Sequence, residues 1–478
     1  MLTGSALTDR ERAIVEAAPK QLLIGGRWRD PASGATFAVE DPSTGRPLCE
    51  VADAGPEDGL EALAAASAAQ DAWAAHPPRE RGEILRRAHE TLIRRADDLA
   101  LLMTLEMGKA VAESRAEILY AADFLRWFSE EAVRIDGSWT VAPSGAGRLV
   151  VMHQPVGPCV LVTPWNFPMA MGTRKVAPAI AAGCTMVVKP AQQTPLSMLE
   201  LARVLEQAGL PAGVLNLVTT SSPGALVRPL LQDPRTRKLS FTGSTEVGRR
   251  LAEMSAGNLL RVSMELGGNA PFLVFEDADL DAAVEGAMVA KMRNIGEACT
   301  AANRFHVADS VADEFARRLA ERMGALRMGR GSDPDTQVGP LIDDAGRGKV
   351  VDLVDDAVRR GARVLVGGAP VDGPGHFYAP EEIFGPVAPI TRFRTEEEAI
   401  ALANDTEYGL VAFVYTRDLS RAMRVVEALQ TGMVGLNQGM VSNAAAPFGG
   451  VKQSGFGREG GHEGIREYLE VKYVAVAR

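Results

Sequence analysis

Cys299 is the residue whose neighbours best suit chemistry at a thiol. It lies in the stretch 294–304, where the adjacent residues are small and polar, a setting typical of an exposed thiol at the edge of a cleft. A single cysteine is more often a small buried apolar residue, and the spacing gives no argument for a cysteine–histidine pair. Cys49, Cys159 and Cys184 lie in apolar or loop contexts that favour this structural interpretation. For Cys299 both interpretations remain open.

Two further residues stand where acid–base or oxyanion chemistry is possible. Glu265 separates an apolar run from a double glycine. A carboxylate in such a position is by default a surface residue, but partial burial in a cleft would raise its pKa toward that of a general base. Asn166 lies between two prolines, where it is either a turn residue or an amide that donates to a developing oxyanion.

A dinucleotide site needs a tight turn between a strand and a helix. The sequence has no GxGxxG motif, and the nearest substitute is the stretch 241–248, which leaves an expected strand and opens an expected helix. Gly243 permits a close backbone approach, and Ser244 can both cap the helix and donate to a phosphate. A plain helix cap is the competing interpretation.

The composition is that of an ordinary globular protein. With 478 residues, 46% hydrophobic and 23% charged, the chain is long enough for about two to four domains and does not resemble a disordered chain. Its 51 basic and 61 acidic residues give a formal net charge of −10, which argues against nucleic acid or an anionic membrane as the main partner. We expect a small-molecule ligand, any anionic part of which is held by a few local cations.

Targeting and metal-binding signals are weak in this sequence. The N-terminus lacks the apolar region of a signal peptide, and no run of eighteen apolar residues occurs, so neither a signal peptide nor a membrane span is expected. The four cysteines form no CxxC pair and the six histidines no HExxH spacing, which predicts neither a disulfide framework nor a metal site. We therefore expect a cytoplasmic protein in a reducing compartment.

The elements that must position these residues follow an alternating pattern. Residues 56–134 carry apolar side chains at helical spacing, and from Leu149 short β-branched runs alternate with helical stretches. This rhythm predicts the doubly wound α/β class, with parallel sheets covered on both faces. The expected strands are 159–162, 185–188, 215–218 and 238–241 in a first series and 271–275, 304–307, 364–366, 411–415 and 433–436 in a second. The β-prone segments 140–151 and 468–476 could pair with each other or with another subunit.

Five motifs together resemble the NAD(P)-dependent aldehyde dehydrogenase superfamily over residues 22–474. They are TPWNFP at 163–168, MELGG at 264–268, the stretch 296–304 around Cys299, EIFGP at 382–386 and PFGG at 447–450. The resemblance implies a Rossmann-like cofactor-binding domain, an α/β catalytic domain and a small β oligomerisation arm, in a homodimer or homotetramer. The expected boundaries are 1–134 and 152–264 for the first, 265–462 for the second, and 135–151 and 463–478 for the arm.

The resemblance also implies three catalytic roles. Cys299 would attack the aldehyde carbon and form a thiohemiacetal and then a thioester. The Asn166 amide would hold the oxyanion, a kind of contact whose loss typically costs about 10²–10³ in rate. Glu265 would activate the water that hydrolyses the thioester.

The implied cofactor-binding residues are Trp165, Asn166, Lys189, Pro190, Ala191, Gln192, Gly243, Ser244, Leu266 and Glu382. Lys189 is expected at the adenosine ribose and Glu382 at the nicotinamide ribose. The neutral Gln192 stands where a glutamate would repel a 2′-phosphate. NADP is therefore the expected cofactor, with NAD as the second option. A strand and turn that the family has just before Glu382 are missing here, which could displace that residue.

For the substrate, the best resemblance is to the succinate-semialdehyde dehydrogenases. Arg174, Arg293 and Ser442 match the positions where that subgroup keeps a clamp for the distal carboxylate of the aldehyde. From the residues alone, the two arginines are more simply structural ion-pair partners. Glutarate semialdehyde or another small aldehyde is the alternative substrate. The alternative from another class of function is a protein that binds NADP but is catalytically silent.

Overall fold

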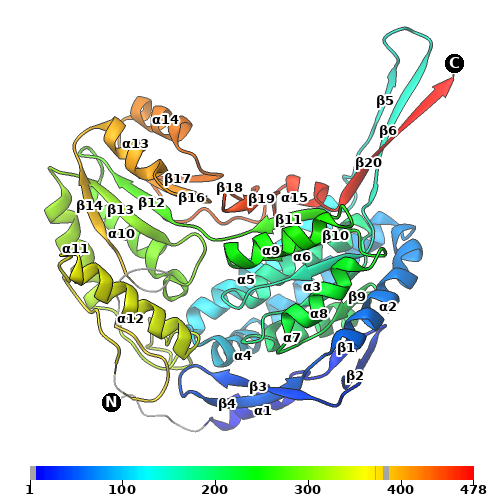
Figure 1. Cartoon of the computed structure of the whole chain (residues 1–478), viewed down its shortest axis with the longest axis horizontal. Coiled ribbons are helices and arrows are strands. Elements are labelled where there is room, and N and C mark those ends of the chain that lie inside the picture. The colour runs from blue at the N-terminus through cyan, green and yellow to red at the C-terminus, as the bar shows by residue number, and fades with distance from the viewer. Residues whose placement is uncertain (1–6, 372, 380–386, 478) are drawn as a thin grey trace.

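The structure is a computed structural model that describes residues 7–371, 373–379 and 387–477 (Figure 1). Two α/β units lie side by side, and a three-stranded arm projects from one of them (Figure 1). Glu382 and the expected gap before it lie outside the described residues.

The helical pattern over 56–134 corresponds to four consecutive helices. They are α2 (Pro56–Ala74), α3 (Pro78–Arg94), α4 (Ala96–Met107) and α5 (Val111–Glu131). Pro56 and Pro78 occupy the first turns of their helices, where the missing N–H breaks no intrahelical bond. The preceding elements are α1 (Asp9–Ala17), β1 (Leu22–Ile24), β2 (Arg27–Arg29), β3 (Thr36–Asp41) and β4 (Arg46–Ala52).

The first α/β unit contains an eight-stranded sheet with the order β19-β11-β10-β7-β8-β9-β1-β2. Its other strands are β7 (Cys159–Val162), β8 (Met186–Lys189), β9 (Leu215–Leu217), β10 (Lys238–Thr242), β11 (Arg261–Glu265) and β19 (Gly455–Phe456). The helices between them are α6 (Pro168–Ala182), α7 (Leu196–Gln207), α8 (Pro223–Gln232) and α9 (Thr245–Ala256). Strands β7 to β11 are parallel, and their alternate residues enter two cores, one with α3 to α7 and one with α2, α8 and α9. The doubly wound class is confirmed.

The second α/β unit contains a five-stranded, entirely parallel sheet with the order β14-β13-β12-β16-β17. The strands are β12 (Ala270–Val274), β13 (Ala302–Ala308), β14 (Ile390–Phe393), β16 (Val411–Tyr415) and β17 (Met433–Leu436). The helices are α10 (Leu280–Met292), α11 (Ala312–Gly324), α12 (Asp344–Arg359), α13 (Glu396–Asn404) and α14 (Leu419–Ala428). The short elements are η1 (Arg293–Gly296), β15 (Tyr408–Gly409), β18 (Val451–Lys452) and α15 (Glu463–Arg466).

The prediction of a strand at 364–366 is wrong. This segment pairs with no strand, and Val364 and Leu365 are 40% and 49% exposed. Its side chains instead line an apolar hollow of about 520 Å³ together with α11, α12 and the start of β14. A β-branched run indicates only that the side chains fit a pleated surface, and without a neighbouring strand to bond its backbone the segment stays irregular.

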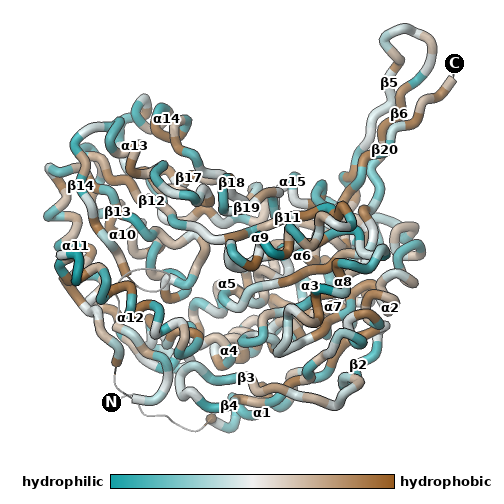
Figure 2. The backbone as a smooth tube through the Cα atoms, viewed as in Figure 1, coloured by the Kyte–Doolittle hydropathy of each residue, from teal (hydrophilic) through white to brown (hydrophobic). Residues whose placement is uncertain are grey.

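The arm consists of β5 (Ser138–Val141), β6 (Gly147–Pro155) and β20 (Leu469–Ala477). The two β-prone segments thus pair with each other, antiparallel from Leu469 opposite Pro155 to Ala477 opposite Gly147. The arm carries exposed apolar side chains, including Trp139 at 65% exposure. Hydrophobic stretches run along β6 and β20 (Figure 2). None of the described helices is both long and apolar enough to cross a membrane.

The division into domains stays a prediction. Most of the range 265–462 belongs to the second α/β unit, but β19 within it is the edge strand of the eight-stranded sheet, where it pairs with β11. The C-terminal part of the chain therefore returns to the first unit directly beside Glu265.

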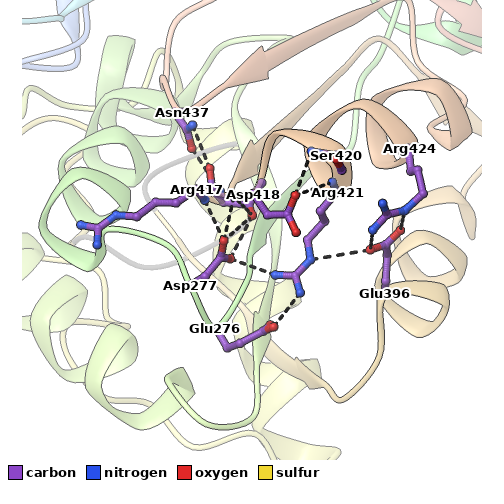
Figure 3. A network of polar contacts seen from close by, with 10 residues as sticks. Glu276, Asp277, Glu396, Arg417, Asp418, Ser420, Arg421, Arg424 and Asn437 are labelled. Atoms are coloured by element: carbon purple, nitrogen blue, oxygen red, sulfur yellow. Dashed lines mark hydrogen bonds and ion pairs between the residues drawn. The ribbon is translucent and has the colours of Figure 1, made fainter.

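A network of ion pairs fixes α13 and α14 against the loop after β12 (Figure 3). The Asp277 carboxylate accepts hydrogen bonds of 2.9 Å from the Thr416 hydroxyl and from the Arg421 guanidinium. Two backbone N–H groups that follow β16 also donate to it at 2.9 Å. Arg421 continues the network to Glu276 at 2.7 Å. These contacts hold the outer helices of the five-stranded sheet in place.

Candidate active site

Cys299 follows a strained turn between α10 and β13. Asn294, Ile295 and Gly296 have φ values of 55°, 61° and 76°. A β-branched residue such as Ile295 rarely adopts this left-handed conformation, and such strain persists only where the surroundings enforce it. The Cys299 side chain at the end of the turn is half-buried rather than packed within the core.

Buried hydrogen bonds enforce this turn. The Asn294 side chain accepts from Lys109 Nζ at 2.7 Å and donates to the carbonyls of Asn166 and Glu297, both at 3.0 Å. The Asn294 backbone N–H donates to the Glu113 carboxylate at 2.8 Å. The strained loop is therefore anchored to helix α5 and to the segment after β7.

Asn166 lies beside this loop. It follows β7 and precedes α6, is 8% exposed, and its Nδ2 donates to the Glu297 carbonyl at 2.8 Å, two residues before Cys299. The amide nitrogen carries two hydrogens, so one remains for an oxygen held near the thiol. The structure thus brings Asn166 and the Cys299 loop together.

Sequence reasoning missed the pair that supports Asn166. Lys109 Nζ donates to the Asn166 carbonyl at 3.1 Å and pairs with the Glu117 carboxylate. Glu117 in turn accepts from the N–H groups of Met169 and Ala170 at 2.9 and 3.0 Å, at the start of α6. Charged residues in a helical region usually belong to a solvated face, so nothing in the sequence marks this buried pair.

Glu265 ends β11 and is 3% exposed. Burial raises the pKa of its carboxyl group to about 8, and the negative charge of Glu459 adds to this, while Arg174 and Lys175 oppose it. Its Oε2 has no hydrogen-bond partner in the described part of the chain. A buried, unpaired carboxylate with a raised pKa has the properties of a general base.

Glu265 and Cys299 share one site. A Cβ added to Gly268, three residues after Glu265, would lie 2.2 Å from the Cys299 carbonyl oxygen, so the two segments run against each other. Burial raises the pKa of the Cys299 thiol to about 12, with the Glu265 charge as the next cause, while Arg174 and Arg293 lower it. The thiol is therefore neutral near pH 7 and must give up its proton before it attacks a carbonyl.

Two arginines and a serine gather near the thiol. Arg174 on α6 donates to the Tyr120 hydroxyl at 3.0 Å, and its guanidinium lies 3.8 Å from the Phe448 ring centroid. Arg293 lies 5.8 Å from the Tyr120 ring centroid and donates to Ser442 Oγ at 3.5 Å. Sequence reasoning missed Tyr120, which joins the two arginines. The Arg174 Nε has no hydrogen-bond partner among the described residues.

Apart from Glu382, which lies outside the described residues, the residues expected to bind the cofactor line one edge of the eight-stranded sheet. Trp165 and Asn166 follow β7, Lys189 ends β8, Gly243 and Ser244 follow β10, and Leu266 follows β11. Carboxyl ends of parallel strands meet at one edge, which is where α/β proteins bind nucleotides. Pro190, Ala191 and Gln192 continue directly from Lys189 at this edge.

This edge suits an anionic ligand. Lys189 is 6% exposed and makes no ion pair within 4.0 Å in the described part of the chain, and burial lowers the pKa of its ammonium group to about 8. Ser244 caps α9, whose N-terminal N–H groups can also receive a phosphate. Gly243 packs on the Phe241 ring so closely that an added Cβ would lie 2.4 Å from it. A dinucleotide with a phosphate near Lys189 would fit these residues.

The family model for the aldehyde dehydrogenase family matches residues 28–474. The chain belongs to the aldehyde dehydrogenase family. Among its relatives, the succinate-semialdehyde dehydrogenase of Paenarthrobacter nicotinovorans is 60% identical over 444 residues, covering 90% of this chain and 99% of the relative. The glutarate-semialdehyde dehydrogenase of Pseudomonas putida is 49% identical over 472 residues, covering 96% of this chain and 98% of the relative.

Solved structures show the same fold. A crystal structure described as an NADP dependent enzyme of Escherichia coli matches with a TM-score of 0.95 at 48% identity, covering 99% of this chain and 100% of that one. The aldehyde dehydrogenase fold expected from the sequence motifs is confirmed. As an NAD(P)-dependent aldehyde dehydrogenase, the protein oxidises an aldehyde through a cysteine thiohemiacetal. In the described part of the chain, no three His, Cys, Asp or Glu residues lie close enough to hold a metal ion.

Proposed function

We propose that the aldehyde is succinate semialdehyde and that the enzyme oxidises it to succinate with NADP. The observation that carries this proposal is the group of two guanidinium ions and one hydroxyl around Tyr120, next to the thiol. The charges of Arg174 and Arg293 both act on Cys299. A short aldehyde with a carboxylate at its far end could place its carbonyl at the sulfur and its carboxylate at the arginines.

Acylation begins at Cys299. The sulfur bonds to the aldehyde carbon, the thiol proton passes to Glu265, and the carbonyl oxygen becomes an oxyanion. Asn166 Nδ2 and the Cys299 backbone N–H donate to that oxyanion in the thiohemiacetal. NADP, when bound, supplies the acceptor for the hydride that leaves this carbon.

Deacylation uses Glu265 a second time, after its carboxyl group has released the thiol proton to solvent. Its carboxylate takes a proton from water, and the resulting hydroxide attacks the thioester left on Cys299. The bond between the carbonyl carbon and the sulfur then breaks, the newly formed carboxylic acid gives its proton to the sulfur, and succinate departs. The raised pKa of Glu265, about 8, makes its carboxyl group a stronger base than an exposed glutamate.

The cofactor is proposed to lie along the edge of β7, β8, β10 and β11. Lys189 would hold the 2′-phosphate and Ser244 the pyrophosphate, with the neutral Gln192 allowing the phosphate to approach. The similar crystal structure from Escherichia coli is described as that of an NADP dependent enzyme, which supports this choice of cofactor. Glu382, which lies outside the described residues, is proposed for the nicotinamide ribose.

Glutarate semialdehyde is the second candidate substrate, since a relative at 49% identity carries that name. One additional methylene changes binding by only about 1–3 kcal/mol. A homodimer or homotetramer joined through the arm also belongs to this proposal, with the exposed apolar side chains of β5, β6 and β20 as support. The cytoplasmic location stays a prediction.

The test of the substrate is a panel of aldehydes with and without a terminal carboxylate, assayed on wild-type enzyme and on Arg293→Ala. We expect kcat/KM for succinate semialdehyde to fall by about 10–10² in the variant, since a charged hydrogen bond is worth about 1.5–3 kcal/mol. With propanal, which lacks the carboxylate, kcat/KM should change little.

Arg249→Ala, which removes an exposed arginine that pairs with Glu407 at 3.2 Å, is the matched control. An unchanged KM for succinate semialdehyde in Arg293→Ala, or an equal loss with propanal, would refute the carboxylate clamp. The catalytically silent alternative is not favoured, because the family and the relatives that match this chain are dehydrogenases.

A further inference from the structure

Each arginine of the proposed carboxylate clamp has one nitrogen in contact with a methionine sulfur. Arg174 Nη1 donates to Met171 Sδ at 3.3 Å, and Arg293 Nη1 donates to Met440 Sδ at the same distance. A thioether sulfur is a weak acceptor, so it holds a guanidinium in place without neutralising its charge. The two contacts are alike in chemistry, but they differ in what surrounds the sulfur.

Solvent reaches one of these two methionines. Met171 lies on α6 and is 5% exposed, whereas Met440 lies in the loop after β17 and is 36% exposed. Met440 and Arg293 also line one hollow of about 400 Å³, together with Met288 and Met292 on α10. A small polar solute can therefore approach the Met440 side chain from solvent, while the packing around α6 shields Met171.

Arg293 is held less firmly than Arg174. Arg174 is 1% exposed and pairs with the Glu459 carboxylate at 3.6 Å. Among the described residues, no carboxylate lies within 4.0 Å of the Arg293 guanidinium, whose Nη1 donates to Met440 Sδ at 3.3 Å and to Ser442 Oγ at 3.5 Å. A chemical change at the Met440 sulfur therefore acts directly on the guanidinium that is proposed to hold the substrate carboxylate.

We infer that Met440 is an oxidation site through which hydrogen peroxide weakens the binding of carboxylated aldehydes. The inference rests on the proposed carboxylate clamp. In methionine sulfoxide the oxygen on the sulfur is a strong acceptor, and at this position it takes a hydrogen bond from Arg293 Nη1. The sulfoxide thus competes with the substrate carboxylate for the same guanidinium. Reductases convert methionine sulfoxide back to methionine, so the effect is reversible.

The oxidation balances in atoms and electrons. A lone pair of the Met440 sulfur attacks one oxygen of hydrogen peroxide, the O–O bond breaks and an S–O bond forms. The proton on the transferred oxygen passes to the departing hydroxide, which leaves as water. The sulfur is thereby oxidised, the peroxide is reduced, and no other side chain changes its protonation state.

The test compares untreated and peroxide-treated enzyme with the thiol of Cys299 protected. Peroxide also oxidises reactive cysteines, so methyl methanethiosulfonate first caps the accessible thiols as methyl disulfides. Dithiothreitol removes these caps after the treatment and leaves methionine sulfoxide unchanged. Peptide mass spectrometry then measures the fraction of each methionine that has gained an oxygen atom, and we expect Met440 to be oxidised while Met171 stays reduced.

The oxidised enzyme should discriminate less between aldehydes with and without a carboxylate. We expect KM for succinate semialdehyde to rise by about tenfold, because one charged hydrogen bond to the substrate is weakened. The rise should follow the oxidised fraction of Met440, and kcat should change little. For propanal, which has no carboxylate, kcat/KM should keep its untreated value. Methionine sulfoxide reductase should restore the original KM for succinate semialdehyde.

Variants of two exposed methionines separate this site from general oxidation. Met440→Leu has no sulfur to oxidise at this position, so its KM for succinate semialdehyde should be the same before and after peroxide treatment. Met440→Gln places a polar acceptor beside Arg293 and should raise this KM without peroxide. The matched control is Met423→Leu on α14, which removes a methionine that is 50% exposed. Its response to peroxide should equal that of wild type.

Three results would overturn the inference. They are complete oxidation of Met440 with an unchanged KM, a Met440 that stays reduced while Met423 is oxidised, and an equal loss of kcat/KM with propanal. Arg293→Ala distinguishes this inference from the proposed function. If Arg293→Ala loses activity selectively with succinate semialdehyde but the sulfoxide does not raise KM, the clamp stands and the oxidation site is refuted. If Arg293→Ala keeps the wild-type KM, the clamp itself is refuted, and the oxidation site with it.

Discussion

At the scale of single residues, Gln192 offers the sharpest test of cofactor choice. Gln192→Glu would place a negative charge beside the proposed 2′-phosphate site next to Lys189. We expect KM for NADP to rise by about tenfold or more and the preference to move toward NAD. Steady-state kinetics with both cofactors measures this, and Gln193→Glu supplies the same charge one residue away. Equal effects of the two variants would contradict a specific role for Gln192.

Lys189 adds a pH dependence to the same site. Burial lowers the pKa of its ammonium group to about 8 in the free enzyme, so the positive charge is present below that pH and lost above it. Affinity for NADP should therefore weaken as the pH rises past about 8, and affinity for NAD should change less.

The individual site residues were only partly predictable from the sequence. Asn166, Glu265 and Cys299 stand in motifs of unusual composition, and the structure brings their segments together. Tyr120 and Glu459 carry no local signal, because their roles arise from partners far away in the chain. Lys175 and Glu459, for example, are 284 residues apart.

At the scale of single elements, β13 contains a histidine that makes the five-stranded sheet sensitive to acid. His306 is 5% exposed, its Nδ1 lies 2.6 Å from the Thr391 hydroxyl on β14, and burial lowers its pKa from 6.5 to about 4. Between pH 6.5 and pH 4 the imidazole of His306 binds a proton in the unfolded chain but stays neutral in the folded chain. The free energy of unfolding therefore decreases as the pH falls from 6.5 toward 4.

We therefore expect His306→Gln to lose less stability than wild type between pH 7.5 and pH 4.5. The difference should approach about 3 kcal/mol, since one pKa unit corresponds to about 1.4 kcal/mol. Urea unfolding at the two pH values measures it, and His153→Gln, in the exposed arm, is the control. A parallel loss in wild type and His306→Gln would show that other groups cause the acid sensitivity.

The order of elements was largely predictable, because alternation of β-branched runs with helical stretches indicates parallel sheets directly. The strand wrongly expected at 364–366 and the strand β14, which was not expected, have a common physical cause. The segment 364–366 has the composition of a strand but no strand beside it, whereas β14 becomes a strand through its register with β13. The pairing of one strand with another depends on the tertiary structure, so a short apolar run in the sequence does not predict it.

At the scale of the whole molecule, the arm is the surface best suited to contact a second copy. Trp139, Val150 and Val474 lie opposite one another across the three strands and so share a face. Exposed apolar faces of this kind mark association sites. We expect the double variant Trp139→Asp/Val474→Asp to sediment as a smaller species than wild type. Gln207→Glu, at the end of α7, is the control, and an unchanged sedimentation coefficient in the double variant would refute association through this face.

The edge strand β19 has a consequence for how the enzyme is made. Glu265 belongs to a strand whose outer neighbour, Gly455–Phe456, emerges from the ribosome almost two hundred residues later. Domains generally begin to fold N-terminal first during synthesis. The growing chain can therefore assemble most of the eight-stranded sheet while β11, the strand that carries Glu265, still lacks its outer neighbour β19. Chemistry on reactive aldehydes would then begin only after the last segment of the polypeptide has been added.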